Sequence, residues 1–371
     1  MQKKIFVSVT NELNSDQRVH RTCLTLQKAG YEVELIGRAY KNSIPLDERP
    51  YKCRRMSLFF RKGPFFYAEY NLRLFIILLF NKADFLFSND LDTLLPNYLV
   101  ASIKRQKLIY DSHELFTELP ELLGRPFVQK FWSTLEGLIF PRLQNIITVN
   151  NSIAEIYTKK YKKNIQVIRN IPKSIKIQGK LSKESIGFHK SDFLIILQGA
   201  GINIDRGAEE ALEAMKYVFG AKLLIIGSGD VFEKLKQLRK KFHLEDKVRI
   251  IDKLPYSELM EYTSIADLGL SFDKDTNLNY LNSLPNKVFD YIHANTPLLC
   301  SRLPEIMSLI ENYRIGATVK NVRPQCIADN INSIMSKPSL LKEWKSNLVK
   351  AELELNWEKE EASYLAFLQK I

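Results

Sequence analysis

Short apolar runs alternate with longer segments of helical periodicity along this chain, and the alternation occurs twice. The strand-like runs of the first half are 5–10, 31–36, 84–87, 107–110 and 145–149. Those of the second half are 193–198, 222–226, 248–251 and 268–272. Strands that alternate with helices form parallel sheets that helices cover on both faces. We therefore predict an α/β protein with two doubly wound, Rossmann-like parallel-sheet domains.

The length of 371 residues also favours two domains, because it exceeds what one hydrophobic core usually serves. The stretch VIRNIPK at 167–173 is the candidate linker, since Pro172 biases the residue before it away from helical geometry. We expect an N-terminal domain over 1–168 and a C-terminal domain over 169–352. Residues 353–371 form an amphipathic helical pattern, expected to pack back on the first domain.

Secretion, membrane insertion and metal binding receive no support from the sequence. The first residues, MQKKIFVSVTNEL, lack the apolar core of a signal peptide. The run LFIILLF at 74–80 is far shorter than the roughly 20 residues that span a bilayer. The four cysteines lie too far apart in sequence to suggest a disulfide framework or a zinc cluster. We expect a cytoplasmic protein with no bound metal.

The excess positive charge lies in the first half. Residues 1–165 carry 25 Lys and Arg against 16 Asp and Glu, whereas the remainder carries 29 against 26. Between Arg49 and Arg73 basic residues mix with Phe and Tyr, and Glu69 is the only acid. This mixture suits an anionic membrane surface, here the inner face of the plasma membrane. A solvated basic face over core aromatics fits equally well. Binding to nucleic acid is not expected.

The loops after the strands of the second half are the first place to seek a ligand site, because parallel sheets bind ligands at the carboxyl ends of their strands. Gly199 and Gly201 follow one strand, and Gly227 and Gly229 follow the next. Glycine lets a ligand approach the backbone closely. Two such pairs in successive loops fit a nucleotide, although turns between strands and helices use glycine routinely.

The segment NSLPNKVFDYIHANTP at 282–297 predicts an anion site at the start of a helix. Asn282 or Ser283 is expected to cap this helix, with Asn286 and Lys287 in its first turn. A lysine there opposes the helix dipole, which indicates a compensating anion nearby, although a surface lysine tolerates the small cost.

Arg206 follows the same logic after the glycine-rich loop of the first strand. We predict that Arg206 and Lys287 together hold a diphosphate. Asp290, one helical turn beyond Asn286, is placed to accept hydrogen bonds from a ribose diol, although such an acid is more often simply solvated.

In the first half, the strand KLIYD runs into YDSHELFTE, which places His113 at the carboxyl edge of the predicted sheet. A lone histidine is usually structural. This loop, however, lies where the first domain is expected to face the second across a cleft. Asp90 and Asp92 occupy a comparable loop, and Arg18 and His20 lie near the first one.

These motifs together resemble glycosyltransferase family 4, whose members are retaining enzymes of the GT-B fold that use nucleotide-sugar donors. The likeness runs along essentially the whole chain and follows the family's order. The segments that carry it are DQRVHRTCLTLQKAGYEVELIGR, YDSHELFTE, VIRNIP, QGAGINIDRGAEEALEAM, LLIIGSGD, LPYSELMEYTSIADLGL and LPNKVFDYIHANTPLLCSRLPEI.

The resemblance implies roles for particular residues. Arg206 and Lys287 would hold the donor diphosphate, Asp290 the ribose, and His113 would face the transferred sugar. The base would contact the backbone at Asp252, Lys253 and Leu254. Asn282 stands at the first place of the family's paired-glutamate motif, the place of the sugar contact, and Asp290 stands at the second. The other positions expected to contact the donor are Gly199, Gly227, Gly229, Ser283 and Asn286.

The sequence departs from the family pattern at three places. Both acids of the glutamate pair are altered, since Asn282 carries no charge and Asp290 has a shorter stem. Ala200 replaces an arginine that is common in the family, so the diphosphate would depend more on Arg206 and Lys287. The first loop, 11–15, lacks the family's glycine pair.

We therefore predict a metal-independent, retaining glycosyltransferase of cell-surface polysaccharide or glycolipid synthesis. Its co-substrate would be a UDP- or GDP-sugar, with no other cofactor, and its acceptor a glycan or a lipid-linked molecule. Two alternatives stay open. A sugar-nucleotide epimerase on the same fold would act on the donor alone. A non-catalytic basic protein would bind membranes or nucleic acid with salt sensitivity and gain no stability from nucleotides.

Overall fold

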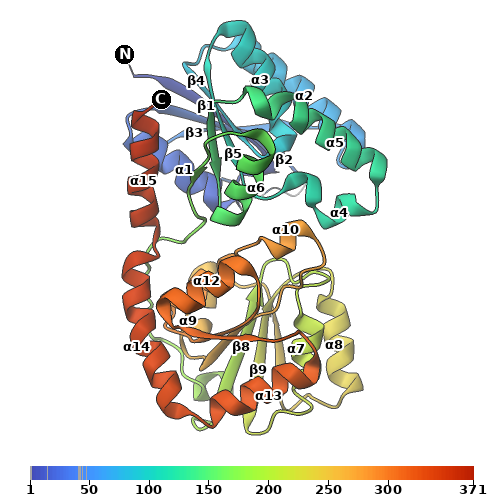
Figure 1. The fold of residues 1–371 in the computed structure, drawn as a ribbon, viewed down its shortest axis with the longest axis vertical. Helices are drawn as coiled ribbons and strands as arrows, with labels where there is room; N and C mark the ends of the chain where they lie inside the picture. The colour runs from blue at the N-terminus through green and yellow to red at the C-terminus, as the bar shows by residue number, and fades with distance from the viewer. Residues whose placement is uncertain (1, 15, 41–42, 44, 47) are drawn as a thin grey trace. The chain divides into compact units, whose positions relative to one another are not determined.

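The structure is a computed structural model that describes residues 2–14, 16–40, 43, 45–46 and 48–371. The chain divides into two compact units (Figure 1). Unit 1 comprises Met1–Asn170 and Glu360–Ile371, and unit 2 comprises Ile171–Lys359. The expected division between the halves was at residue 168, two residues before the one found.

Unit 1 is built on a seven-stranded sheet in the order β3-β2-β1-β4-β5-β6-β7, in which every neighbouring pair is parallel. Its strands are β1 (Lys4–Glu12), β2 (Glu32–Ala39), β3 (Lys52–Ser57), β4 (Phe85–Asn89), β5 (Lys107–Ser112), β6 (Asn145–Thr148) and β7 (Gln166–Val167). The strand order reverses at β1, because β2 and β4 lie on its two sides. Such a reversal marks the ligand-binding edge of a doubly wound sheet.

The helices of unit 1 form because their apolar residues repeat at helical spacing and pack on the sheet. They are α1 (Gln17–Lys28), α2 (Gly63–Phe80), α3 (Leu91–Lys104), α4 (Pro120–Leu123), α5 (Pro126–Ile139), α6 (Asn151–Tyr161) and the C-terminal α15 (Trp357–Gln369). Asp16 caps α1 by accepting a hydrogen bond from the backbone N–H of Val19. The apolar run LFIILLF is the second half of α2. None of the helices in the described ranges is both long and apolar enough to cross a bilayer.

Unit 2 contains a six-stranded sheet in the order β10-β9-β8-β11-β12-β13, again with parallel neighbours throughout. The strands are β8 (Phe193–Gly199), β9 (Ala221–Gly227), β10 (Val248–Asp252), β11 (Leu268–Ser271), β12 (Leu298–Ser301) and β13 (Gly316–Val319). The helices are α7 (Ala208–Ala214), α8 (Phe232–Lys241), α9 (Tyr256–Ser264), α10 (Leu278–Leu281), α11 (Asn286–His293), α12 (Pro304–Tyr313), α13 (Pro324–Met335) and α14 (Pro338–Glu354). The strand order reverses between β8 and β11.

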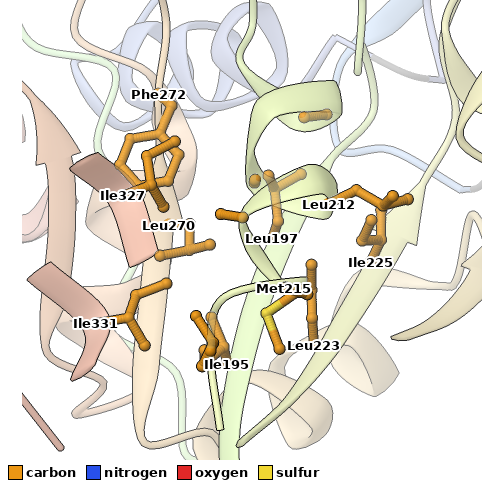
Figure 2. Close-up of a cluster of buried hydrophobic side chains, with 14 of the residues drawn as sticks. Ile195, Leu197, Leu212, Met215, Leu223, Ile225, Leu270, Phe272, Ile327 and Ile331 are labelled. Carbon is orange, nitrogen blue, oxygen red and sulfur yellow. The ribbon is translucent and has the colours of Figure 1, made fainter. Parts of the chain in front are cut away.

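The core of unit 2 has two layers, one on each face of its sheet. Alternate residues of β8 belong to opposite layers, with Ile195 and Leu197 in one and Leu194 and Ile196 in the other. Figure 2 shows the first layer, where β8, β9 and β11 meet side chains of α7 and α13. Because both faces are buried, these strands read as continuous apolar runs.

The chain returns to unit 1 at its C-terminus. Asn356 separates α14 from α15 and caps both helices. Its side-chain N–H donates to the carbonyls of Glu352 and Leu353, and its Oδ1 accepts from the N–H of Lys359 at 3.0 Å. One helix had been expected over 353–371, whereas the structure has the end of α14 and then α15.

The predicted fold class is confirmed, because both units are doubly wound α/β domains with parallel sheets. Three strands of the structure, β3, β12 and β13, were not predicted, and the two residues of β7 overlap the start of the predicted linker. β3 has the sequence KCRRMS, whose positive charges mask the strand pattern. Arg54 and Arg55 are tolerated there because they pair with Glu34 of β2 and Glu12 of β1 at 2.7 and 2.8 Å.

Candidate functional site

In unit 2, the loops after β8 and β11 meet at the point where the strand order reverses. Gly207, which has a φ of +72°, lies so close to Phe272 that a Cβ would stand 2.3 Å from the Phe272 carbonyl oxygen. The N–H of Lys274 also donates to the carbonyl of Asp205. These contacts hold Arg206 beside the end of β11.

Asp273, the second residue after β11, is the centre of a charged cluster. Its carboxylate is fully buried and forms an ion pair with the guanidinium of Arg206. Lys287, in the first turn of α11, contributes a second cation, with its Nζ 3.6 Å from Asp273 Oδ1. The guanidinium of Arg206 also lies over the ring of Tyr280, at 4.2 Å. Two cations therefore share one carboxylate. This leaves a net charge of about +1 at the point where the strand order of the sheet reverses.

Burial alone would lower the pKa of Arg206, but Asp273 and Tyr280 outweigh that effect and raise it above its ordinary value. Arg206 is therefore charged at every physiological pH. Its Nε is buried and forms no hydrogen bond among the described residues, and the same holds for Asp273 Oδ1. A site with fixed positive charge and spare donors can bind an anion without rearrangement.

Asp290 lies on α11, one turn after Asn286, and two protein donors fix its carboxylate. Gln198 Nε2 donates to Oδ2 at 3.0 Å, and the hydroxyl of Tyr256 donates to Oδ1 at 2.8 Å. Gln198 is itself held by Thr263, whose hydroxyl donates to its Oε1 at 2.6 Å. Each carboxylate oxygen has two lone pairs, so Asp290 retains capacity to accept hydrogen bonds from a ligand.

The glycines of the β8 and β9 loops have a packing role. A Cβ at Gly227 would stand 1.8 Å from the carbonyl oxygen of Gly199, and one at Gly229 would stand 2.4 Å from that of Ile202. Both have a φ of +150°. Close approach of the two loops therefore requires glycine at 227 and 229, whether or not a ligand is bound. A Cβ at Gly199, in contrast, would make an ordinary contact, 3.4 Å from Ile202 Cγ1.

The expectation that Asn282 or Ser283 caps the helix of Lys287 is wrong. The N-cap of α11 is Pro285, and no side chain caps it. Residues 278–281 instead form the short helix α10, to which both polar side chains bond back. Asn282 Nδ2 donates to the carbonyl of Leu278 at 2.7 Å, and the hydroxyl of Ser283 donates to that of Tyr280 at 2.9 Å. Asn286 is the first residue of α11.

The three residues expected near the base lie at the edge of the second sheet. Asp252 ends β10, the edge strand, and its side chain is mostly exposed, 3.6 Å from Lys236. Lys253 is also exposed, whereas Leu254 packs partly against the core. Tyr256, two residues beyond Leu254, reaches Asp290, so this loop lies on the side of α11 that carries the carboxylate.

In unit 1, His113 lies between two carboxylates at the carboxyl edge of the first sheet. Its Nδ1 is 3.2 Å from Asp90 Oδ2, and its Nε2 is 3.3 Å from Asp111 Oδ2. The backbone N–H of His113 also donates to Asp90 at 2.8 Å. Burial would lower the pKa of the imidazole, but the two carboxylates outweigh it and raise the pKa to about 9. His113 is therefore an imidazolium at neutral pH, and not a general base.

Asp111 is almost completely buried and is held by Arg18 through two hydrogen bonds, at 2.7 and 3.0 Å. Burial alone would raise the pKa of this carboxyl, but Arg18 and His113 hold it well below its usual range. In Asp92, burial and the nearby Asp90 raise the pKa to about 7, and its Oδ2 accepts a hydrogen bond from Thr10 at 2.5 Å. Since Asp92 is only partly ionised at neutral pH, Arg18 and His113 are balanced chiefly by Asp90 and Asp111.

Sequence reasoning missed four residues that build the site in unit 2, namely Asp273, Gln198, Tyr256 and Tyr280. Asp273 and Gln198 lie at the carboxyl ends of β11 and β8, so the rule that located the glycines also applies to them. Tyr256 and Tyr280 carried no such signal, because their contacts depend on how helices pack.

Several solved structures share this GT-B fold. A sucrose-phosphate synthase from Thermosynechococcus elongatus has a TM-score of 0.78 at 14% identity, covering 100% of this chain and 99% of that chain. A glycosyltransferase from Rickettsia africae has a TM-score of 0.76 at 15% identity, covering 100% and 98%. HepE from Anabaena in complex with UDP-glucose has a TM-score of 0.73 at 13% identity, covering both chains completely. A comparison with curated proteins finds no significant match.

Family models match both halves of the chain. The model described as glycosyltransferase family 4 matches residues 16–171, and the one described as glycosyl transferases group 1 matches residues 181–350. The chain thus belongs to the family 4, group 1 glycosyltransferases and is an enzyme that uses nucleotide sugars. This assignment confirms the resemblance seen in the sequence. It favours sugar transfer over the epimerase and non-catalytic alternatives.

Proposed function

We propose that this enzyme transfers a sugar, with retention, from a UDP- or GDP-sugar bound by unit 2 to an acceptor hydroxyl bound by unit 1. The observation that carries the proposal is the convergence of Arg206 and Lys287 on the single buried carboxylate of Asp273. Their excess positive charge lies where an open α/β sheet binds ligands, and it suits a donor diphosphate.

The difficult step is departure of the nucleoside diphosphate, on which negative charge develops as the bond to the sugar breaks. In the proposed mechanism Arg206 and Lys287 stabilise that charge without a metal ion. Asp273 fixes the two cations beforehand, so little reorganisation is needed when the bond breaks. Asp290, oriented by Gln198 and Tyr256, accepts hydrogen bonds from the ribose diol, and the backbone at 252–254 contacts the base.

Asn282 and His113 are the proposed contacts to the transferred sugar. The amide of Asn282 is 8% exposed and bonds to α10, so it would bind a hydroxyl rather than stabilise a positive charge. His113, as an imidazolium, is a hydrogen-bond donor only, which suits a sugar hydroxyl as its partner.

The acceptor is proposed to be a glycan or lipid-linked molecule of cell-surface synthesis, met at a membrane surface. Helices α2 and α3 contact one another, as do α3 and α5, and all three expose large apolar side chains. These are Phe65, Leu72, Ile76 and Phe80 on α2, Leu99 and Ile103 on α3, and Phe127, Phe131 and Leu138 on α5. Together with the basic residues of 49–73, they fit peripheral contact with anionic lipid.

The test combines nucleotide binding with two substitutions. UDP, GDP, ADP and their sugars are added to the protein while its melting temperature is followed. A ligand at about one hundred times its Kd should add about 2.7 kcal/mol of stability. Arg206→Ala and Lys287→Ala should each lower kcat about 10²–10³-fold in a donor-turnover assay with EDTA present, because each removes charge from the leaving group.

Lys234→Ala is the matched control, since Lys234 is an exposed lysine of unit 2 that pairs with Glu209 at 3.4 Å. It should leave turnover unchanged. Full activity in both Arg206→Ala and Lys287→Ala would refute the assignment of the diphosphate site.

A further inference from the structure

Unit 1 contains a cavity of about 230 Å³ that the site described above does not use. It lies at the carboxyl ends of β2 and β3, beside the start of α2. The residues that line it are Arg38, Ala39, Tyr40, Ser57, Leu58, Phe60, Arg61 and Phe66. Pockets for complete small molecules usually enclose roughly 300–1,000 Å³, so this one suits a single head group.

Arg38 is the most informative residue of this pocket. Its guanidinium lies close to two rings, 4.0 Å from the centroid of Tyr40 and 4.4 Å from that of Phe66. Contact with aromatic faces leaves the N–H donors at the edge of a guanidinium available. Within the described ranges, the Arg38 side chain has no carboxylate partner, and its Nε is buried without a hydrogen bond. Burial lowers its pKa, yet an arginine stays charged.

The nearby Arg55, in contrast to Arg38, has a carboxylate partner. Arg55, on β3, forms an ion pair with Glu12 at 2.8 Å, and Glu12 also accepts a hydrogen bond from the hydroxyl of Ser43. Glu12 is thus engaged by other groups. Arg38 and Arg61 supply two positive charges to the pocket, and none of the described residues that line it is acidic. A compact anion with several acceptor oxygens fits such a pocket, and a phosphate group has this chemistry.

The rim of the pocket is apolar and exposed. Phe60 lines the pocket and is half exposed, and its ring lies 5.3 Å from that of Phe65. Phe59 and Phe65 are 84% and 69% exposed. Glu69 holds this segment in place, because its carboxylate accepts the N–H groups of Phe59 and Phe60 and pairs with Arg73. The exposed rings are therefore displayed by a fixed backbone, directly beside a basic pocket.

We propose that the Arg38 pocket binds the phosphate group of an amphiphilic acceptor, while Phe59, Phe60 and Phe65 contact its apolar portion at a lipid surface. This inference rests on the proposed function where it calls the ligand an acceptor. It adds the chemical class of that acceptor, a phosphate-bearing lipid, and the place where its head group is held.

The experiment measures binding of the protein to a phosphate group on a lipid and to a phosphate group on a soluble molecule, and it does not depend on enzymatic turnover. One arm follows sedimentation of the full-length protein with phosphatidylcholine vesicles that contain either phosphatidic acid or phosphatidylserine. Both lipids are anionic, but only phosphatidic acid has a terminal phosphate. The other arm titrates soluble glycerol 3-phosphate by calorimetry. Tighter binding to phosphatidic acid than to either other probe is expected, since that lipid offers both the phosphate and the apolar surface.

Substitutions distinguish binding in the pocket from attraction by the positive charge of the surrounding surface. Arg38→Gln and Arg61→Gln should each weaken binding to phosphatidic acid about ten-fold, the effect of losing one hydrogen bond to a charged group. Lys62→Gln removes the same charge from an exposed residue that does not line the pocket, so it should weaken binding to phosphatidic acid and to phosphatidylserine by the same factor, about five-fold or less, and leave glycerol 3-phosphate unaffected. Phe60→Ser should weaken binding to vesicles while leaving glycerol 3-phosphate unaffected.

Equal losses in Lys62→Gln and Arg38→Gln would overturn the proposal, and so would equal binding to the two anionic lipids. Arg61 is exposed, so its substitution keeps the test valid if Arg38→Gln proves unstable. Nucleotide stabilisation is measured separately on the same protein. If the protein binds nucleotides but neither phosphate probe, this inference alone is refuted. If it binds the phosphate probes but no nucleotide, only the proposed donor site is refuted.

Discussion

The two units each gather charged side chains at the carboxyl edge of a parallel sheet, but they balance those charges differently. In unit 1, Arg18 and His113 face Asp90 and Asp111, so two cations meet two carboxylates. In unit 2, Arg206 and Lys287 share only Asp273. A balanced cluster fixes geometry, whereas an unbalanced one also attracts an anion. The comparison explains why the donor diphosphate is assigned to unit 2.

The largest expected effect comes from the same change made in both clusters. Asp111→Asn should lower the free energy of unfolding by about 3–5 kcal/mol, because Arg18 is almost completely buried and would keep an uncompensated charge. Asp273→Asn should cost less, about 1–2 kcal/mol, because the side chains of Arg206 and Lys287 are 26% and 12% exposed and can gain water. Chemical denaturation followed by circular dichroism measures both.

Glu155→Gln is the control for this pair of variants. Glu155 is exposed and pairs with Lys159 at 3.5 Å, so the cost should stay below about 0.5 kcal/mol. Equal losses for Asp111→Asn and Asp273→Asn would show that the two clusters do not differ in the way described.

A smaller effect is expected in how the free energy of unfolding depends on pH, through the charge of His113. Its pKa in the folded protein is about 9, above the ordinary value near 6.5. The stability that the imidazolium contributes is therefore fully present below pH 6.5 and is lost as pH rises through about 9. Asp92, with a pKa of about 7, titrates below most of this window. The stability difference between the wild-type protein and His113→Gln should shrink between pH 7.5 and pH 10.

The measurement is denaturation across that range, with the imidazole titration followed by NMR. Asp90, Asp111, Asp92 and Arg18 are charged groups that act on the ring. A titration midpoint near 6.5 would mean that the carboxylates do not hold the proton on His113, and unit 1 would then carry a different charge balance.

The smallest effect is expected at Asp290, which belongs to unit 2 but lies outside the Asp273 cluster. Asp290→Asn should weaken binding of the preferred nucleotide about ten-fold, because the amide accepts fewer hydrogen bonds from the ribose diol. The fold should be retained, since the remaining side-chain oxygen can accept a hydrogen bond from Gln198 while the new amide N–H donates to the hydroxyl of Tyr256. Calorimetry with the nucleoside diphosphate tests this, and unchanged binding would place the ribose role elsewhere.

The alternation of strands and helices was readable in the sequence because buried parallel strands are continuous apolar runs. β8 and β9 show this directly, with the sequences FLIILQG and AKLLIIG. β3 was not readable, because Arg54 and Arg55 are neutralised by Glu34 and Glu12, which lie 20 and 43 residues earlier in the chain. Local composition cannot reveal such partners.

The candidate site was predictable in part, because the predicted strands show where their carboxyl ends lie. Arg206, Lys287 and Asp290 were found because each lies at a recognisable position, near the start of a helix after a strand. Asp273 was missed although it follows β11, because its partners Arg206 and Lys287 come from other segments of the chain. The capping role expected for Asn282 and Ser283 failed because α10, a helix of four residues, gives too little periodicity to detect.

Asn356 ends α14 and starts α15, and the contacts that α15 then makes have a practical consequence for building chimeric enzymes from members of this family. Glu360 accepts hydrogen bonds from the backbone and guanidinium of Arg169, and Glu361 bonds to Thr25 and Lys28. The first half is thus completed by the last residues of the chain. An exchange of acceptor specificity that transplants only 1–170 would mismatch this helix, whereas one that carries 360–371 along would keep the native partners together.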